Sequence, residues 1–179
     1  LKFIVHLTNG VMGHSFKPFY GGGTYEGALI LPLFVELILD GYHVDFRYIS
    51  DIILRRIQQN RSHEIIAVTD GIFPIPQEIP KGEFRMYSTV CERSSDDGVF
   101  FVKGRIKKDG SLLSVPSNTL CSSKLTMDKA FENLLNMLTK DLHGFMIDRK
   151  AMPFNDAIKY ASMFTSSNQA LLQGVSNKT

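Results

Sequence analysis

His6, His43 and Asp70 each lie at the end of a short apolar run of this sequence. Neutral imidazole is a good ligand for zinc and similar ions, and a carboxylate beside a metal can take a proton from bound water. The metal lowers the pKa of that water from about 15.7 toward roughly 7, so hydroxide is available at neutral pH. If the three side chains converge on one mouth, they provide the groups that a metal-dependent hydrolase needs.

The three apolar runs predict parallel strands of one sheet. We expect strands over Phe3–Leu7, Val35–Leu39 and Glu64–Val68, with a helix over Ile49–Gln59 between the last two. Such alternation is typical of parallel strands joined by crossovers, so the strands should be neighbours or near neighbours. Because the chemistry of such sheets lies at the carboxyl ends of the strands, the three ionisable side chains should share one edge.

The segments between these strands carry weaker signals. Thr8–Gly27 contains six glycines and predicts a long loop, and loops of this length inside compact domains are usually functional. Ala28–Phe34 fits a short helix broken near Pro32 or an extended segment. Ser50 or Asp51 is the expected N-cap of the following helix.

From Pro74 onward the pattern changes to a hairpin followed by helices. Val99–Arg105 and Ser111–Val115 flank an Asp-Gly pair, which is a standard hairpin signal. Apolar positions at helical spacing predict one helix over Thr126–Thr139 and a second over Pro153–Met163, with proline at its start.

The composition describes an ordinary globular protein. The 179 residues are 44% hydrophobic and 21% charged, which suits one domain but is short for a complete (β/α)₈ barrel of roughly 250 residues. A net charge of +2 argues against a nucleic-acid partner, and Pro32 and Glu36 interrupt the apolar segment Ala28–Leu39, which argues against a membrane span.

Cys91 and Cys121 lack metal-ligand spacing, so we expect reduced thiols in a cytosolic protein. The chain opens on an apolar run without a signal-peptide pattern, and we expect it to begin in mid-fold.

Several motifs resemble segments of the N-acetylglucosamine-6-phosphate deacetylases, which belong to the metal-dependent amidohydrolases. His6–Gly10 resembles their His-Leu-x-Asn-Ala segment, and Leu39–Val44 resembles Ala-Asp-Gly-x-His-Val. Val68–Gly71 is similar to Val-Thr-Asp-Ala, and Thr119–Met127 to Thr-Leu-Ala-Gly-Ser-x-Leu-Thr-Met. Ala157–Gly174 resembles a helical segment near the carboxyl end of the family. Order and spacing agree from position 6 to about position 174.

The resemblance implies the fold and the activity. The chain would be the carboxy-terminal part of a TIM-type (β/α)₈ hydrolase barrel, with a β-hairpin excursion and trailing helices. As a single partial domain it would comprise the last barrel strands (1–73), a loop and hairpin (74–118) and the helices (119–175). The implied reaction is hydrolytic deacetylation of N-acetylglucosamine 6-phosphate to glucosamine 6-phosphate and acetate, in amino-sugar catabolism. The enzyme would be longer than this chain, homodimeric and cytoplasmic, without nucleic-acid or membrane partners.

The resemblance also implies residue roles. His6 would ligate a divalent metal, zinc or iron, whose remaining ligands (a Glu and another His) lie outside this chain, so the chain alone should be inactive. Asp70 would be the catalytic acid and base. Lys17 stands where the family has an arginine that helps to bind phosphate. The other positions carried over as substrate contacts are Asn9, Gly10, Asp40, Gly41, Tyr42, His43, Leu120, Cys121 and Ser122.

Because most of the family's metal ligands lie outside this chain, alternatives stay open, and the sequence also departs from the family pattern. Lys17 keeps a cation for phosphate but loses the bidentate fork of arginine, and Cys121-Ser122 replaces Ala-Gly in the predicted substrate turn. One alternative is a non-catalytic, degenerate homologue that binds a sugar phosphate or a partner subunit. Another is an amidohydrolase for a different amide, such as an N-acyl amino acid. Upstream sequence with a His-x-His strand and a bridging Glu would favour the enzyme.

Overall fold

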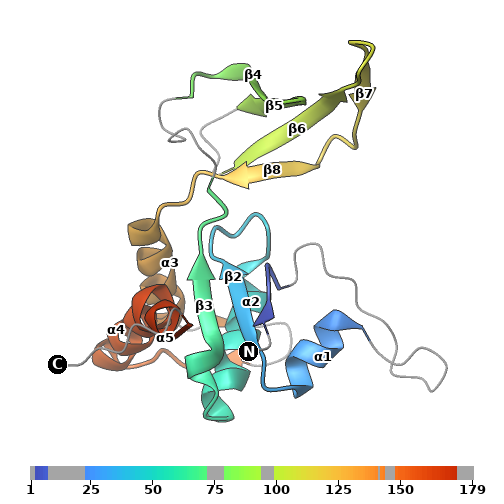
Figure 1. Cartoon of the computed structure of the whole chain (residues 1–179). Coiled ribbons are helices and arrows are strands. Elements are labelled where there is room, and N and C mark those ends of the chain that lie inside the picture. The colour runs from blue at the N-terminus through green and yellow to red at the C-terminus, as the bar shows by residue number, and fades with distance from the viewer. Residues whose placement is uncertain are drawn as a thin grey trace. The chain divides into compact units, whose positions relative to one another are not determined.

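The computed structural model describes residues 3–7, 23–71, 79–93, 99–140, 142–143 and 148–172 of the chain. The chain divides into two compact units. The first combines Leu1–Val68 with Met127–Thr179, and the second is Thr69–Thr126. Each unit is a separate body with its own sheet (Figure 1). None of the helices within the described residues is both long and apolar enough to cross a membrane.

The sheet of the first unit is parallel, as the sequence predicts. Its strands β1 (Phe3–Ile4), β2 (Phe34–Ile38) and β3 (Ile65–Val68) are adjacent in that order. Both neighbouring pairs are parallel, and helix α2 (Phe46–Gln58) connects β2 to the short 3₁₀ turn η1 (Ser62–Glu64) before β3. Buried aliphatic side chains of β2 and β3 form the centre of this unit, which explains why these runs read as continuous apolar segments.

Helix α1 (Thr24–Ile30) begins inside the segment predicted to be a loop. The loop prediction is therefore wrong for 24–27, and residues 8–22 lie outside the described part of the chain. The amide N–H of Leu31 donates to the carbonyl of Gly27 at 2.8 Å. Pro32 has no N–H to continue this ladder, and it disfavours helical geometry at the preceding residue, so the helix ends before it.

The N-cap of α2 is Asp45, and the prediction of Ser50 or Asp51 is wrong. The Asp45 carboxylate accepts the amide N–H of Arg47 at 2.8 Å. Ser50 and Asp51 lie within the helix and are buried. The buried apolar periodicity begins only at Ile49 because the first turn of α2, Phe46 to Tyr48, is partly or fully exposed. The sequence pattern therefore placed the start of the helix too late.

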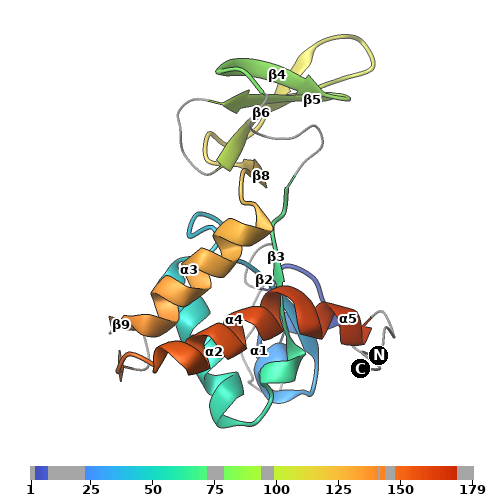
Figure 2. The ribbon, with the colours of Figure 1, turned by 90° about the vertical axis from the view of Figure 1, so that its left-hand side faces the viewer.

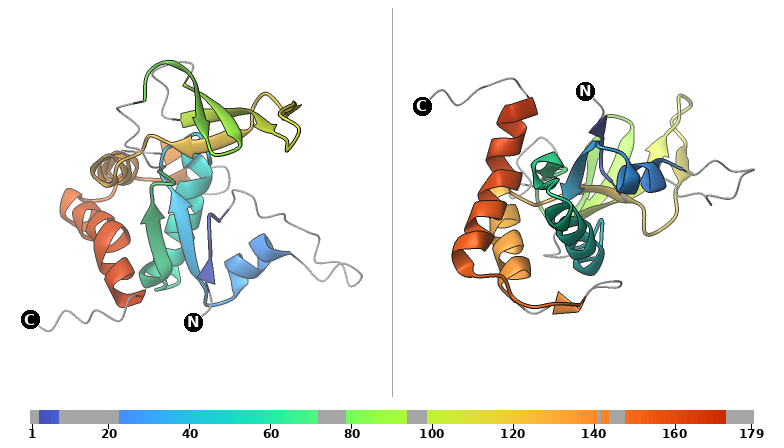
Figure 3. Two further views of the ribbon diagram at one scale, coloured as in Figure 1. Left: turned by 45° about the horizontal axis from the view of Figure 1, so that its top comes forward. Right: turned by 90° about the horizontal axis from the view of Figure 1, so that it is seen from below.

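Helices from the carboxyl-terminal part of the chain pack against the edge strand β3. Figure 2 shows α3 and α4 lying side by side, and Figure 3 shows the same pair from two further directions. Asn168 is buried, and its side-chain amide donates to the carbonyls of Ser62 (3.0 Å) and Ile65 (2.6 Å). Both predicted helices are confirmed. The elements of this part are α3 (Met127–Thr139), β9 (Leu142–His143), β10 (Asp148–Arg149), α4 (Phe154–Ser162), the π-helical turn η3 (Met163–Ser167) and α5 (Asn168–Leu172).

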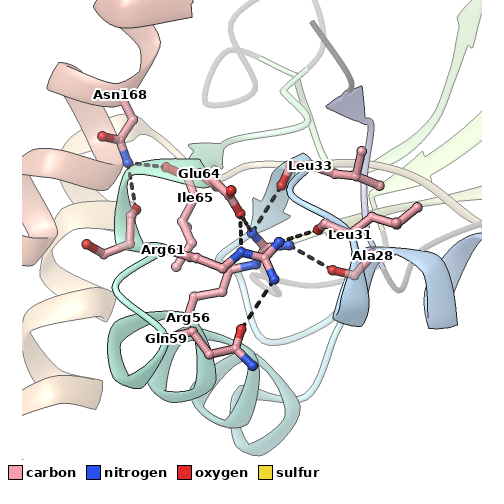
Figure 4. Close-up of polar contacts among 10 residues, drawn as sticks. Ala28, Leu31, Leu33, Arg56, Gln59, Arg61, Glu64, Ile65 and Asn168 are labelled. Carbon is pink, nitrogen blue, oxygen red and sulfur yellow. Dashed lines mark hydrogen bonds and ion pairs between the residues drawn. The ribbon is translucent and has the colours of Figure 1, made fainter.

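A buried ion pair joins α2 to η1, and its arginine also bonds the segment that enters β2 (Figure 4). The Arg56 guanidinium donates to the Glu64 carboxylate and to the carbonyls of Leu33 (3.0 Å) and Ala28 (2.9 Å). Arg61 donates to the same carboxylate at 2.8 Å. Only 5% of the Arg56 side chain and 7% of the Glu64 side chain are exposed. The arginine therefore supplies two backbone oxygens with donors from a buried side chain.

The second unit is an antiparallel sheet. Its strand order is β4-β5-β6-β7, and β8 pairs with β6. The predicted hairpin is confirmed as the antiparallel pair of β6 and β7. The β4–β5 hairpin was not predicted, and β8 is a strand where a turn was expected. The strands are β4 (Gly82–Met86), β5 (Thr89–Arg93), β6 (Val99–Ile106), β7 (Leu112–Ser114) and β8 (Leu120–Ser123).

Candidate functional site

His6 stands just past β1, beside a carboxylate of the neighbouring strand. Its Nε2 lies 3.7 Å from Oε2 of Glu36, and 35% of the His6 side chain and 17% of the Glu36 side chain are exposed. The next residue continues the strand pairing, because Leu7 N–H donates to the Glu36 carbonyl at 2.9 Å. The backbone of His6 has φ 47°, a left-handed conformation that is uncommon outside glycine and often found at functional sites.

Glu36 is a candidate that the sequence interpretation missed. It appeared there only as a charge that interrupts an apolar segment, but a carboxylate within a buried run is itself a signal, because such groups are rarely buried without a partner. Imidazole and carboxylate are both zinc ligands, yet a catalytic zinc normally has three protein ligands. Within the described residues no cluster of three His, Cys, Asp or Glu side chains is positioned to hold a metal. His6 and Glu36 therefore fit a divalent metal by type, but they provide only part of a ligand set.

The second motif forms a closed turn after β2. The Asp40 carboxylate accepts the amide N–H groups of Tyr42 (2.9 Å) and His43 (3.0 Å) and lies 2.7 Å from His43 Nδ1. Only 3% of the Asp40 side chain and 2% of the His43 side chain are exposed. Gly41 has φ 77°, and a Cβ there would lie 2.6 Å from Cε2 of Phe46. The turn thus requires glycine twice over, for its backbone angle and for the space.

The carboxylate of this turn stays ionised despite its burial. Burial alone would raise the pKa of Asp40, but the hydrogen bonds from His43 and Tyr42 and the charge of His43 lower it below its ordinary value. An ionised carboxylate only accepts hydrogen bonds, so the proton of the contact lies on His43 Nδ1. In the neutral ring Nε2 is then the acceptor, and it is the nitrogen that gains a proton when the ring becomes charged.

The predicted substrate residues of this turn differ in exposure and in the hydrogen bonds that they make within it. Both carboxylate oxygens of Asp40 already accept hydrogen bonds within the turn, so its clearest role is to orient His43. Tyr42 is 52% exposed and is available to a ligand. Substrate contact by Asp40, Gly41, Tyr42 and His43 stays a prediction.

Asp70 follows β3 and belongs to the second unit, where β8 holds its backbone. Its carbonyl accepts the amide N–H of Ser123 at 3.0 Å and the hydroxyl of Ser122. Gly71 forms a parallel bridge with Ser123. The backbone of Asp70 is also left-handed, with φ 50°, and its side chain is partly exposed. The predicted catalytic carboxylate is therefore fixed through its main chain.

The predicted substrate turn Leu120-Cys121-Ser122 is part of the same arrangement. Ser122 is buried, its hydroxyl donates to the Asp70 carbonyl, and it is paired with Phe100 in the β6–β8 ladder. Cys121 is partly exposed, and its sulfur lies 3.0 Å from that of the buried Cys91. Burial, together with the hydrogen bond and charge of Cys91, raises the pKa of Cys121 to about 12. The thiol therefore carries no charge at neutral pH.

The remaining predicted positions divide between the two units and the undescribed segment. Asn9, Gly10 and Lys17 lie outside the described residues. His6 and the turn of His43 are in the first unit, whereas Asp70 and the strand of Cys121 are in the second. Their convergence on one site stays a prediction.

Solved structures with a similar fold are N-acetylglucosamine-6-phosphate deacetylases. The enzyme of Mycobacterium smegmatis, in a mutant form complexed with N-acetyl-D-glucosamine-6-phosphate, is 17% identical with a TM-score of 0.66, and 97% of this chain matches 37% of that one. The Thermotoga maritima enzyme is 20% identical, with a TM-score of 0.65 and the same coverages. For the Pasteurella multocida enzyme the identity is 17%, the TM-score 0.61 and the coverages 97% and 35%.

These likenesses show the fold. No family model and no curated protein matches the sequence. The chain has the mixed α/β fold of a part of these deacetylases and spans about 37% of the length of the first of them. The resemblance predicted from the motifs is confirmed at this level, in a chain that shares only 17–20% identity with these structures.

Proposed function

We propose that this chain is part of a longer metal-dependent amidohydrolase that removes the acetyl group from N-acetylglucosamine 6-phosphate. The observation that carries the proposal is the position of three motifs on the parallel sheet. His6, the Asp40–His43 turn and Asp70 each follow the carboxyl end of a strand, which is where α/β enzymes place their chemistry. The fold likeness to solved deacetylases supports the same reaction class.

The proposed fold and setting follow from this reaction. β1, β2 and β3 would be the last strands of a TIM-type (β/α)₈ barrel, followed by the hairpin unit and the trailing helices. The whole enzyme would be a cytoplasmic homodimer. Its substrate would be a phosphorylated amino sugar, without nucleic-acid or membrane partners.

His6, with Glu36 beside it, would contribute to a site for zinc or iron that ligands outside this chain complete. A divalent metal, when bound, polarises a carbonyl and makes hydroxide available at neutral pH. Asp70 would take a proton from the attacking water and return it to the departing amine. His43, held by Asp40, would offer Nε2 to the substrate. The proposed substrate contacts otherwise comprise Asn9, Gly10, Lys17, Gly41, Tyr42, Leu120, Cys121 and Ser122.

Replacing Asp70 by asparagine in the longest natural chain tests the chemistry. Asp70→Asn keeps the volume and removes the base, and positioned acid–base catalysis contributes roughly 10² to 10⁴ in rate. We therefore expect kcat for release of acetate from N-acetylglucosamine 6-phosphate to fall by about that factor, with KM little changed. Asp156→Asn, an exposed carboxylate in the first turn of α4, is the matched control and should keep full activity.

Full activity in Asp70→Asn would end its assignment as the acid and base. If the wild-type form of the longest natural chain, with added zinc, binds the phosphorylated sugar but releases no acetate, the non-catalytic alternative replaces the enzyme. Hydrolysis of N-acyl amino acids in preference to the sugar would point to the third interpretation, an amidohydrolase of another amide.

A further inference from the structure

Cys91 and Cys121 form a close thiol pair inside the second unit. Cys91 lies on β5 and is fully buried, whereas Cys121 lies on β8 and is partly exposed. Both strands pair with β6. The two Sγ atoms are 3.0 Å apart, so an approach of about 1 Å would bring them to the S–S bond length of roughly 2.05 Å. They are also the only two cysteines of the 179-residue chain.

We propose that Cys91 and Cys121 are an oxidation site, converted by a low-molecular-weight disulfide to a protein disulfide that alters the strand holding Asp70. The geometry supplies an entry point and a resolving partner. Cys121 is partly exposed and accessible to a small oxidant, and the buried Cys91 lies within reach of its sulfur.

The exchange balances with a small disulfide such as oxidised glutathione. The Cys121 thiolate attacks one sulfur of the small disulfide, the S–S bond breaks and one glutathione leaves. Cys91 then attacks the Cys121 sulfur of the mixed disulfide and expels the second glutathione. The protein loses two electrons and the two S–H protons, and the small disulfide gains both as two thiols.

The environment of Cys121 makes this reaction slow rather than impossible. Its raised pKa of about 12 leaves a small thiolate fraction at neutral pH, and the thiolate is the nucleophile in exchange. The pair therefore stays reduced during brief exposure to oxidant. It responds to sustained exposure, since Cys91 captures each mixed disulfide that forms.

The position of Cys121 on β8 connects the pair to Asp70. The two residues after it, Ser122 and Ser123, donate the hydrogen bonds that hold the Asp70 carbonyl. A covalent bond at Cys121 would restrain β8 immediately before these donors. The effect on catalysis rests on the proposed function of Asp70, whereas formation of the disulfide does not.

Peptide mapping tests the bond itself. The reduced full chain is incubated with oxidised glutathione, alkylated and digested without reductant. We expect a peptide pair linked through Cys91 and Cys121 that separates on reduction. Cys91→Ala should accumulate glutathione on Cys121 instead, and Cys121→Ala should show no linked peptide. Stable glutathione on wild-type Cys121, or disulfides between chains without the internal link, would overturn the proposal.

Hydrogen exchange and kinetics test the consequence. In the oxidised wild type, the peptide containing Ser123 should change its amide exchange, and deacetylation should change by roughly two- to thirtyfold, the range of a modest coupling between sites. Both changes should reverse with reductant and be absent in Cys121→Ala, which restores the alanine of the family motif. A mapped disulfide with unchanged exchange at Ser123 would overturn the link to Asp70. Absence of deacetylation by the longest natural chain in both redox states would refute the proposed enzyme, while the exchange measurement still decides the link.

Discussion

His6 and Asp70, which the motifs assign to metal binding and catalysis, both stand in the left-handed backbone region, with φ 47° and 50°. Such conformations cost of order 1–3 kcal/mol and persist only where the surroundings fix them. For Asp70 those surroundings are Ser122 and Ser123. For His6 they include the pairing of Leu7 with the backbone of Glu36. The backbone at both positions aims a side chain in a direction that a regular strand would not give.

Asp40 allows a residue-level test through pH. Its pKa is lowered in the folded chain because the hydrogen bonds from His43 and Tyr42 outweigh the effect of burial. A lowered pKa means that the interaction stabilises the fold above the ordinary value of 3.8 and is lost as the pH falls through the lower folded-state value. Asp40→Asn should therefore reduce the free energy of unfolding by about 1–3 kcal/mol at pH 7.

The difference between wild type and Asp40→Asn, followed from about pH 5 downward, should shrink as the pH drops past 3.8. Urea unfolding at a series of pH values measures it. Asp156→Asn, an exposed site, should show no comparable loss at pH 7. A difference that grows as the pH falls below 3.8 would contradict the proposed ionised state of Asp40.

At the scale of elements, the turn between β2 and α2 depends on Gly41. An alanine there would meet both an unfavourable φ of 77° and a Cβ 2.6 Å from the Phe46 ring. Left-handed backbone costs roughly 1–2 kcal/mol outside glycine, and overpacking adds about 1–3 kcal/mol. We expect Gly41→Ala to lower the free energy of unfolding by about 2–5 kcal/mol, measured by chemical denaturation.

Gly110 provides a matched control in the hairpin of the second unit. Its φ is 82°, but a Cβ there would meet nothing within 4 Å. Gly110→Ala should therefore lose only the backbone contribution of about 1–2 kcal/mol. Equal losses at the two glycines would mean that the Phe46 contact has no energetic effect.

The ion pair of Arg56 and Glu64 also acts between elements, because it joins α2 to η1 while Arg56 bonds the carbonyls of Leu33 and Ala28 before β2 (Figure 4). Burial and the charge of Arg61 lower the pKa of Arg56, and Glu64 counteracts both. Removing the carboxylate would leave a buried guanidinium without its counter-charge. Glu64→Ala should therefore cost about 3–5 kcal/mol of folding free energy.

The exposed pair of Lys129 and Glu132 on α3 is the control for that change. Its side chains are 54% and 57% exposed and 2.8 Å apart. Glu132→Ala should cost less than about 0.5 kcal/mol, because solvent screens exposed pairs. Thermal or urea unfolding of both variants measures the contrast, and similar losses would show that burial does not govern the Arg56 pair.

At the scale of the whole chain, the parallel strands, the β6–β7 hairpin and two carboxyl-terminal helices were predictable. Their signals are local: apolar runs that end at polar residues, an Asp-Gly turn and helical spacing of apolar side chains. The β4–β5 hairpin was not predicted because its exposed positions break the apolar alternation. Helix α1 was hidden by neighbouring glycines.

The candidate site was predictable only where a motif marks it. The Asp40–His43 turn follows from sequence spacing, and its geometry explains each of its fixed residues. Glu36 and the Cys91–Cys121 contact were missed because each depends on pairing between strands that are distant in sequence. Thirty positions separate each of these contacts. The local sequence pattern does not reveal which residues of two distant strands lie side by side.

Metal affinity is the property by which this chain should differ from the longer enzyme proposed for it. A catalytic zinc site normally uses three protein ligands, whereas within the described residues His6 lies beside Glu36 and no group of three His, Cys, Asp or Glu side chains could hold a metal. The 179-residue chain should therefore bind zinc more weakly than the micromolar range, and the longest natural chain should bind it more tightly, as competition with a zinc-binding dye would measure.

In that longer chain His6→Ala should abolish the tight site. Glu36→Gln tests the carboxylate beside His6, because it keeps the size of the side chain but removes its charge. It should weaken zinc binding by roughly 10- to 100-fold, as expected for a residue that orients a metal ligand. Tight zinc binding by the 179-residue chain that His6→Ala removes would show that this chain already contains a complete ligand set.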